Sequence, residues 1–206
     1  MTDEFKTIKG ESEGYYTEKR SKFLAFAHHV ETVDEVKALV AGYRKQYYDA
    51  RHVCYAYMLG AGREEYRAND DGEPSSTAGK PILGQINSNE LTDILIVVVR
   101  YYGGVNLGTS GLIVAYREAA ADALSHAQVE IRQVEEYVTF DFPFDMMNGV
   151  MRIVKDMHPR IVEQTYDCST TEGNASQGTN TCHIKLAIRR SEASILKTKL
   201  DKLNFQ

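Results

Sequence analysis

The sequence has no tryptophan, only four prolines and only three cysteines in 206 residues. Those cysteines, Cys54, Cys168 and Cys182, are odd in number, lie far apart and form no Cys-x-x-Cys pair. The spacing supports neither a disulfide framework nor a zinc site. It favours reduced thiols in a cytoplasmic protein.

Long hydrophobic runs are also missing. The longest, ILIVVV at 94–99, has the length of a strand, whereas a membrane helix needs about 20 apolar residues. The first 16 residues are charged and lack the apolar segment of a secretory signal. We therefore expect a cytoplasmic protein that is not embedded in a membrane.

An excess of basic residues is the third absence. The net charge is −5 at pH 7, and neither 1–134 nor 135–206 is basic. This balance argues against strong, charge-driven binding of nucleic acid. The run RKQYYDARH (44–52) is interpreted as a solvated face, so any RNA contact should be local and shape-driven.

The hydrophobic content, 43%, is enough for one large or two small domains. The texture changes near residue 134, which predicts domains at 1–133 and 134–206. In the first, the pattern predicts a strand pair or one bent strand within 15–30 and a helix over 33–47 capped by Thr32. Further along it predicts strands at 52–60, 64–70 and 91–100, a loop at 70–81, and helices near 77–88 and 109–127. The strand at 91–100 is apolar almost throughout and should be central, with both faces covered.

The second domain is predicted as β-α-β-β-α. A strand covers 135–144, a helix covers 145–157 and ends at His158-Pro159, and a hairpin follows around the polar linker 169–180. A last helix covers 191–203, with Ser191 as its cap. This order is one strand short of a ferredoxin-like domain, so either the sheet has three strands or a partner completes it. The overall class is α+β.

A glycine-rich loop, RYYGGVNLGTSG, joins the central strand to the next helix. Backbone amides at a helix N-terminus carry partial positive charge and favour an anion. The loop matches neither the Walker A nor the dinucleotide pattern. Its glycines could instead let the helix pack closely on the sheet. The candidate binding residues here are Gly103, Gly104, Gly108, Thr109 and Ser110.

A second loop, DDGEPSSTAGKP, places three carboxylates within four residues. Crowded carboxylates repel each other and tend to have a cation or an arginine as partner. Arg100, at the end of the buried strand, is the expected partner because a buried arginine needs a counter-charge. The candidate binding residues on this side are Asp70, Asp71, Glu73, Lys80, Arg100 and Arg117.

The two loops together closely resemble those of the IMPACT family, in its bacterial YigZ-like branch. DDGEPSSTAGKPIL is followed by VVVRYYGGVNLGTSGLIVAYREA, and RSKFLAFAHHV (20–30) and ARHVCYAY (50–57) match the family's other blocks in order. The resemblance covers about residues 12–127, and the remainder matches in element order. Ser76 stands where the family commonly has glycine.

The resemblance implies a fold for each domain. The first should adopt the fold of domain IV of elongation factor G, shared with a small-subunit ribosomal protein and galactokinase-type kinases, with an uncommon left-handed β-α-β crossover. The second should be similar to the ferredoxin-like domains III and V of that factor. The family's eukaryotic members restrain the amino-acid-sensing kinase of translation initiation by competing for its activator. They use an extra RWD domain that this sequence lacks, so that partner is not transferred here.

Three hypotheses about function remain. The first is a non-catalytic, translation-associated regulator that binds a ribosome, RNA or translation factor through 70–80 and 100–117. The second is an enzyme acting on a phosphate-containing small molecule or nucleotide, with the carboxylates holding a metal and His52 and Asp71 as its catalytic candidates. His52 could equally be a strand-end residue bonded to backbone.

The third hypothesis makes the two loops mutually structural. Arg100, with Arg117 as a second candidate, would neutralise the carboxylates inside the domain. We favour the first hypothesis over the third, and the third over the second, and we expect no cofactor and no resident metal. The partner's identity and the oligomeric state stay open.

Overall fold

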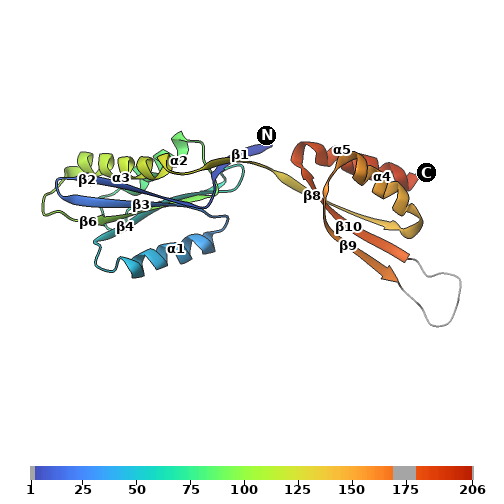
Figure 1. Ribbon diagram of the computed structural model, residues 1–206, viewed down its shortest axis with the longest axis horizontal. Helices are drawn as coiled ribbons and strands as arrows, with labels where there is room; N and C mark the ends of the chain where they lie inside the picture. The colour runs from blue at the N-terminus through green and yellow to red at the C-terminus, as the bar shows by residue number, and fades with distance from the viewer. Residues whose placement is uncertain (1–2, 169–179, 206) are drawn as a thin grey trace. The chain divides into compact units, whose positions relative to one another are not determined.

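The computed structural model describes residues 3–168 and 180–205 (Figure 1). The chain divides into two compact units. The first is Glu4–Arg132, and the second runs from Gln133 onward and includes Asp3. The predicted linker at 169–180 lies, except for Asn180, outside the described residues. Across the described ranges, no helix combines the length and apolarity needed to cross a membrane.

The first unit is built on a five-stranded sheet with the strand order β2-β3-β6-β4-β5. Its central strand, β6, pairs antiparallel with β3 on one side and β4 on the other. Residues 94–100 are all buried, which confirms the prediction of a central strand covered on both faces. The strands are β2 (Glu11–Glu18), β3 (Ser21–His29), β4 (His52–Leu59), β5 (Glu65–Asn69) and β6 (Ile94–Tyr101).

Helices cover both faces of this sheet (Figure 1). α2 (Gly79–Ser88) and α3 (Gly108–Ser125) pack on one face, and α1 (Val33–Gln46) packs on the other. Each face has its own apolar cluster, so alternate side chains of β6 enter different cores. The Thr32 hydroxyl accepts a hydrogen bond from the Glu35 amide, which confirms the predicted cap of α1.

A separate pair of short strands was not anticipated from the sequence. β1 (Glu4–Ile8) pairs with β7 (Val129–Gln133) in a two-stranded sheet. The Lys9 amide donates to the Gln128 carbonyl oxygen at 2.8 Å. These segments are short and mix charged with apolar residues, so their composition gives no strong strand signal.

The second unit has the predicted β-α-β-β-α order, with three strands among its described residues. The sheet order is β8-β10-β9, and β10 is antiparallel to both neighbours. Alternate side chains of β8 and β10 form an apolar core with the helices. The elements are β8 (Glu135–Pro143), η1 (Phe144–Met146), α4 (Met147–Met157), β9 (Arg160–Cys168), β10 (Asn180–Arg189), α5 (Arg190–Asp201) and η2 (Lys202–Phe205).

The predicted cap of the last helix is wrong. α5 begins at Arg190, so Ser191 lies inside its first turn and cannot cap it. Instead, the Ser191 amide donates to the Asp3 carboxylate at 3.3 Å. Hydrogen bonding to Ser191 lowers the pKa of Asp3 below its ordinary value. A carboxylate at a helix N-terminus is favoured by the dipole, which explains why Asp3 takes this role.

Candidate functional site

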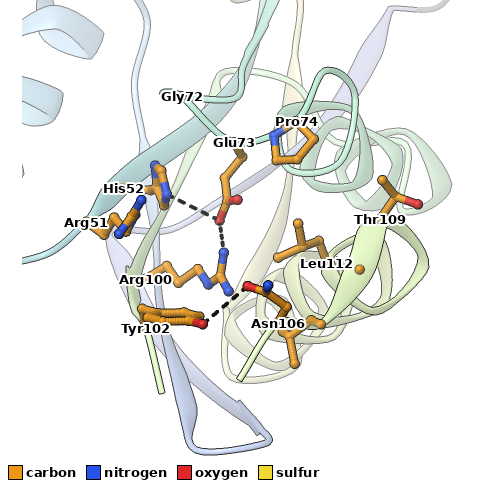
Figure 2. Close-up of a pocket in the computed structure, with 12 residues that line it drawn as sticks. Arg51, His52, Gly72, Glu73, Pro74, Arg100, Tyr102, Asn106, Thr109 and Leu112 are labelled. Atoms are coloured by element: carbon orange, nitrogen blue, oxygen red, sulfur yellow. Dashed lines mark hydrogen bonds and ion pairs between the residues drawn. The ribbon is translucent and has the colours of Figure 1, made fainter. Parts of the chain in front are cut away.

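A pocket of about 490 Å³ forms where the acidic loop, the end of β6 and the start of α3 meet (Figure 2). It brings together five of the residues singled out in the sequence: His52, Glu73, Arg100, Gly108 and Thr109. We call it the Arg100 pocket. Its full lining is Arg51, His52, Gly72, Glu73, Pro74, Arg100, Tyr102, Asn106, Leu107, Gly108, Thr109 and Leu112.

Glu73 and Arg100 form a buried ion pair at the base of the pocket. Their side chains are 3% and 6% exposed, and Arg100 Nη1 donates to Glu73 Oε1 at 2.5 Å. The Tyr116 hydroxyl donates to the same oxygen at 2.8 Å. Burial raises the pKa of Tyr116, so the phenol keeps its proton and remains a donor. The predicted arginine–carboxylate pairing is therefore present, and its carboxylate is Glu73.

Arg100 keeps hydrogen-bonding capacity that the protein does not use. Among the described residues, only its Nη1 group has a partner, and its buried Nε has none. The guanidinium lies 5.5 Å from the Phe23 ring centre and 5.6 Å from that of Tyr102, so aromatic rings hold it in place. An arginine carries five N–H donors, so a fixed guanidinium at the pocket wall can still serve a ligand.

The N-terminus of α3 opens on the same pocket. Leu107 occupies the cap position, no side chain caps the helix, and its first turn has no acidic residue. The first amides of a helix have no partner within the helix, so they can receive an anion. Gly108 has a φ of +70°, a left-handed conformation that glycine adopts without strain.

Arg51 and His52 supply two further nitrogen-bearing side chains. His52 lies opposite Arg100 in the β4–β6 ladder. Its Nδ1 is 2.7 Å from the Asp71 carbonyl oxygen, and because a carbonyl only accepts, we assign the proton to Nδ1. Its Nε2 lies 3.9 Å from Glu73 Oε1, so Glu73 stands between His52 and Arg100, as Figure 2 shows. The Arg51 guanidinium lies 5.9 Å from the Tyr102 ring centre.

Asp70 does not point into the pocket but organises its own loop. Its carboxylate accepts from the amides of Ser76 at 2.8 Å, Ala78 at 3.0 Å and Gly79 at 2.8 Å. It thereby supplies the acceptors for the start of α2. Ser76 has a φ of +65°, so the position where relatives commonly have glycine does adopt a conformation that glycine favours.

Asp71 is equally occupied. One carboxylate oxygen accepts from the Val53 amide at 2.7 Å, and the other accepts from Arg44 at 2.5 Å. The three loop carboxylates thus point to three different sets of protein donors. No group of His, Cys, Asp and Glu side chains suited to a metal ion occurs in the described part of the chain. The three carboxylates are therefore not arranged as the metal site that the enzyme hypothesis requires.

Several sequence candidates lie outside the pocket lining. Lys80 is exposed on α2, and Gly104 and Ser110 are exposed in the glycine loop. Arg117 pairs with its neighbour Glu118 at 3.0 Å. The suggestion that Arg117 neutralises the loop carboxylates is therefore wrong, because its guanidinium bonds along its own helix.

Gly103 has a packing role. A Cβ atom added to it would lie 2.2 Å from the Arg20 carbonyl carbon and 2.3 Å from the Ser21 nitrogen. Its amide donates to the Ser21 hydroxyl at 3.2 Å. The glycine lets the loop pack against the β2–β3 turn, which differs from the predicted close packing of the helix start on the sheet.

Sequence reasoning missed Arg51, Tyr102 and Asn106. Arg51 belongs to the run 44–52, whose tyrosines and cations were visible but were interpreted as a solvated face. The Tyr102 hydroxyl donates to Asn106 Oδ1 at 3.2 Å and closes one side of the pocket (Figure 2). These aromatic, basic and amide residues are evident in the sequence, but only the β4–β6 pairing shows that the segment of Arg51 meets the segment of Tyr102 and Asn106.

Comparison with known proteins places this two-unit α+β fold in a family. Residues 19–124 match the Impact N-terminal domain. The chain is 34% identical over 150 residues to IMPACT family member YigZ of Escherichia coli, covering 72% of this chain and 74% of that protein. It is 39% identical over 97 residues to the Protein IMPACT homolog of Dictyostelium discoideum, covering 45% of this chain and 27% of that protein.

A solved structure aligns with this chain along almost its whole length. It is described as the crystal structure of an hypothetical protein, and it aligns with a TM-score of 0.73 at 26% identity. The alignment covers 98% of this chain and 93% of that one. The chain belongs to the IMPACT family.

Proposed function

We propose that this protein is a non-catalytic, translation-associated regulator that docks on the phosphate backbone of structured RNA, in the ribosome or a translation complex, through the Arg100 pocket. Membership of the IMPACT family supports the link to translation, because the family's eukaryotic members act on translation initiation. One observation carries the choice of ligand. Arg100, fixed by Glu73 and holding unused donors, lines the same pocket as the uncapped N-terminus of α3.

The local charge of the pocket suits a phosphate. Arg51, Arg100 and the α3 amides face a single carboxylate, Glu73, which Arg100 already neutralises. A planar guanidinium matches the oxygens of a phosphate. Because the whole chain carries a net charge of −5, this attraction is confined to the pocket. Such contacts position RNA without reading its sequence.

Tyr102 favours RNA over a free phosphate ion as the ligand. The residue is 43% exposed, and its ring lies beside both arginines of the pocket. An exposed aromatic ring next to a phosphate-binding group can stack a base that is not paired in a duplex. A loop or bulge of structured RNA presents both features together.

The finer fold assignments belong to the same proposal. β3 and β4 are both antiparallel to β6, so they run parallel to each other and are joined through α1. This β-α-β unit supports the fold of elongation factor G domain IV, and the left hand of its crossover stays a prediction. The order β8-β10-β9 supports a ferredoxin-like sheet without its fourth strand.

The enzyme alternative receives no comparable support. The carboxylates that would hold its metal are bound by backbone amides and arginines. The nearby thiol of Cys54 is fully buried, and burial raises its pKa, which disfavours the reactive thiolate. His52 is oriented toward the pocket, but orientation alone defines no reaction.

Ribosome and RNA binding by an Arg51→Glu variant tests the proposal. Arg51 is exposed and forms no ion pair among the described residues, so the fold should tolerate its replacement. We expect binding to weaken roughly tenfold at low salt and the salt dependence to fall by about one phosphate contact. Co-sedimentation with ribosomes and fluorescence anisotropy with a stem-loop RNA would measure both.

Lys45→Glu is the matched control. It makes the same charge reversal at an exposed position on α1, away from the pocket lining. Equal binding by the Arg51→Glu and Lys45→Glu proteins would overturn the proposal. Arg100 is unsuitable for this experiment because its loss would also leave Glu73 buried without its partner.

A further inference from the structure

A groove of about 580 Å³ runs between the two helices of the second unit. It is lined by Arg152, Ile153, Lys155, Asp156, Lys199 and Lys202, and we call it the α4–α5 groove. On α4, the charged positions recur at i, i+3 and i+4 and therefore share one face of the helix. Lys199 and Lys202 are three apart on the opposite wall. The lining thus comes from α4, α5 and the first residue of η2.

Most of the positive charge in this groove is not neutralised. Lys199 Nζ lies 2.5 Å from Asp156 Oδ2, and this hydrogen bond lowers the pKa of Asp156. Within the described ranges, Arg152, Lys155 and Lys202 form no ion pair. The sequence from 135 onward has nine lysines and arginines against ten carboxylates, yet four of the nine gather here. The groove is therefore locally basic, although the sequence from 135 onward is close to neutral overall.

We propose that the α4–α5 groove is a second contact for the RNA phosphate backbone. The identity of the polyanion rests on the function proposed for the Arg100 pocket, whereas the groove itself rests on its own charges. Three unneutralised cations along a channel match a run of phosphates. Lysines act as point charges that hold a backbone without reading bases.

The lining also distinguishes RNA from other acidic partners. Ile153 is its only apolar side chain, and it is half-buried. A protein helix or peptide would be expected to insert apolar anchors, and a membrane surface would be expected to receive a broad apolar face. A groove in which five of the six lining residues are charged fits a phosphate chain better than either.

The test is a Lys155→Ala, Lys202→Ala variant of the whole chain, assayed with a stem-loop RNA from 50 to 200 mM salt. Neither lysine forms an ion pair in the described structure, so the fold should be retained. Each lost phosphate contact removes about one unit from the salt slope. We expect binding to weaken roughly tenfold at 50 mM salt and the slope to fall by about two. Lys9→Ala with Lys45→Ala, two exposed lysines outside both sites, is the control.

The outcomes separate the two proposals. If the groove variant binds as the control does while Arg51→Glu is weakened, the groove proposal alone is overturned. If the reverse holds, the groove stands and the Arg100 pocket does not. Wild-type protein that binds no RNA overturns both. Binding to vesicles that contain phosphatidylserine is measured in parallel. If the protein binds these vesicles more strongly than RNA, and the groove variant loses that binding, the ligand of the groove is a membrane surface and the RNA proposal is overturned.

Discussion

The two loops that meet at the Arg100 pocket use their polar groups in opposite ways. In the acidic loop, 70–81, the carboxylates of Asp70, Asp71 and Glu73 are all engaged by donors of the protein. In the glycine loop, 100–111, α3 begins at Gly108 without a side-chain cap. The acidic loop is held by contacts within the protein, and the glycine loop contributes the start of the helix to which we assign ligand binding in our proposal. A cluster of carboxylates beside a pocket can thus stabilise the fold of a loop rather than take part in binding or catalysis.

Glu73 is the point at which the two roles meet. It belongs to the acidic loop, but its carboxylate holds Arg100 of β6 and Tyr116 of α3. Through Glu73, the acidic loop is therefore joined both to Arg100 in the sheet and to Tyr116 in α3. Replacing Glu73, Arg100 or Tyr116 should show how much of the stability of the site depends on the ion pair.

The largest expected effect is that of Arg100→Met. It leaves the Glu73 carboxylate buried without its charged partner, which costs about 3–5 kcal/mol of unfolding free energy. Urea denaturation followed by circular dichroism would measure it. The double variant with Glu73→Gln should recover most of the loss, because no unpaired charge remains. A double variant no more stable than Arg100→Met would show that the pair is not what supports the site.

A smaller loss is expected for Asp70→Ala. Three backbone amides lose their acceptor, at a cost of about 1–3 kcal/mol. Asp71→Asn should cost less, about 1 kcal/mol, because the amide oxygen can still accept from Val53 and only the exposed Arg44 pair is weakened. Urea midpoints of both proteins would give the order. Asp71→Asn should also retain RNA binding, and the reverse order of stabilities would contradict this account of the loop.

The glycine loop offers the finest comparison. Gly103→Ala would force a Cβ into the Arg20–Ser21 backbone, which we expect to cost about 1–3 kcal/mol through overpacking. Gly108→Ala meets open space and should cost only about 1 kcal/mol, from its positive φ. Thermal unfolding would separate the two. If Gly108→Ala lowered stability more than Gly103→Ala, the start of α3 would be needed for the fold, which would contradict its assignment as a free anion-binding group.

Sequence patterns predicted the strongly periodic elements well. β6 contains an unbroken apolar run, as a strand covered on both faces does, and α3 is long with apolar residues at helical spacing. β1 and β7 are five residues each and mix charges with apolar side chains, so no period is resolved. Ser191 was mistaken for a cap because the acceptor, Asp3, lies far away in the sequence.

The site was predictable in its residue types but not in its pairings. The expectation of an arginine–carboxylate pair followed from burial, but three carboxylates were available and only packing selects Glu73. Arg51 joins the pocket because the β4–β6 register sets His52 opposite Arg100. Register depends on contacts between distant segments, and a single sequence does not display them.

The β1–β7 ladder has a consequence for how the protein can be divided. The Val134 amide donates to the Asp3 carbonyl oxygen at 2.7 Å, and Asp3 belongs to the second unit. Asp3 therefore precedes Glu4–Arg132 in the sequence but belongs to the unit that follows it. A fragment that starts at Gln133 would therefore lack the Asp3 carboxylate at the start of α5. Glu4–Arg132 begins in β1 and ends in β7, and because these strands pair, the two ends of this unit are tied to each other by backbone hydrogen bonds.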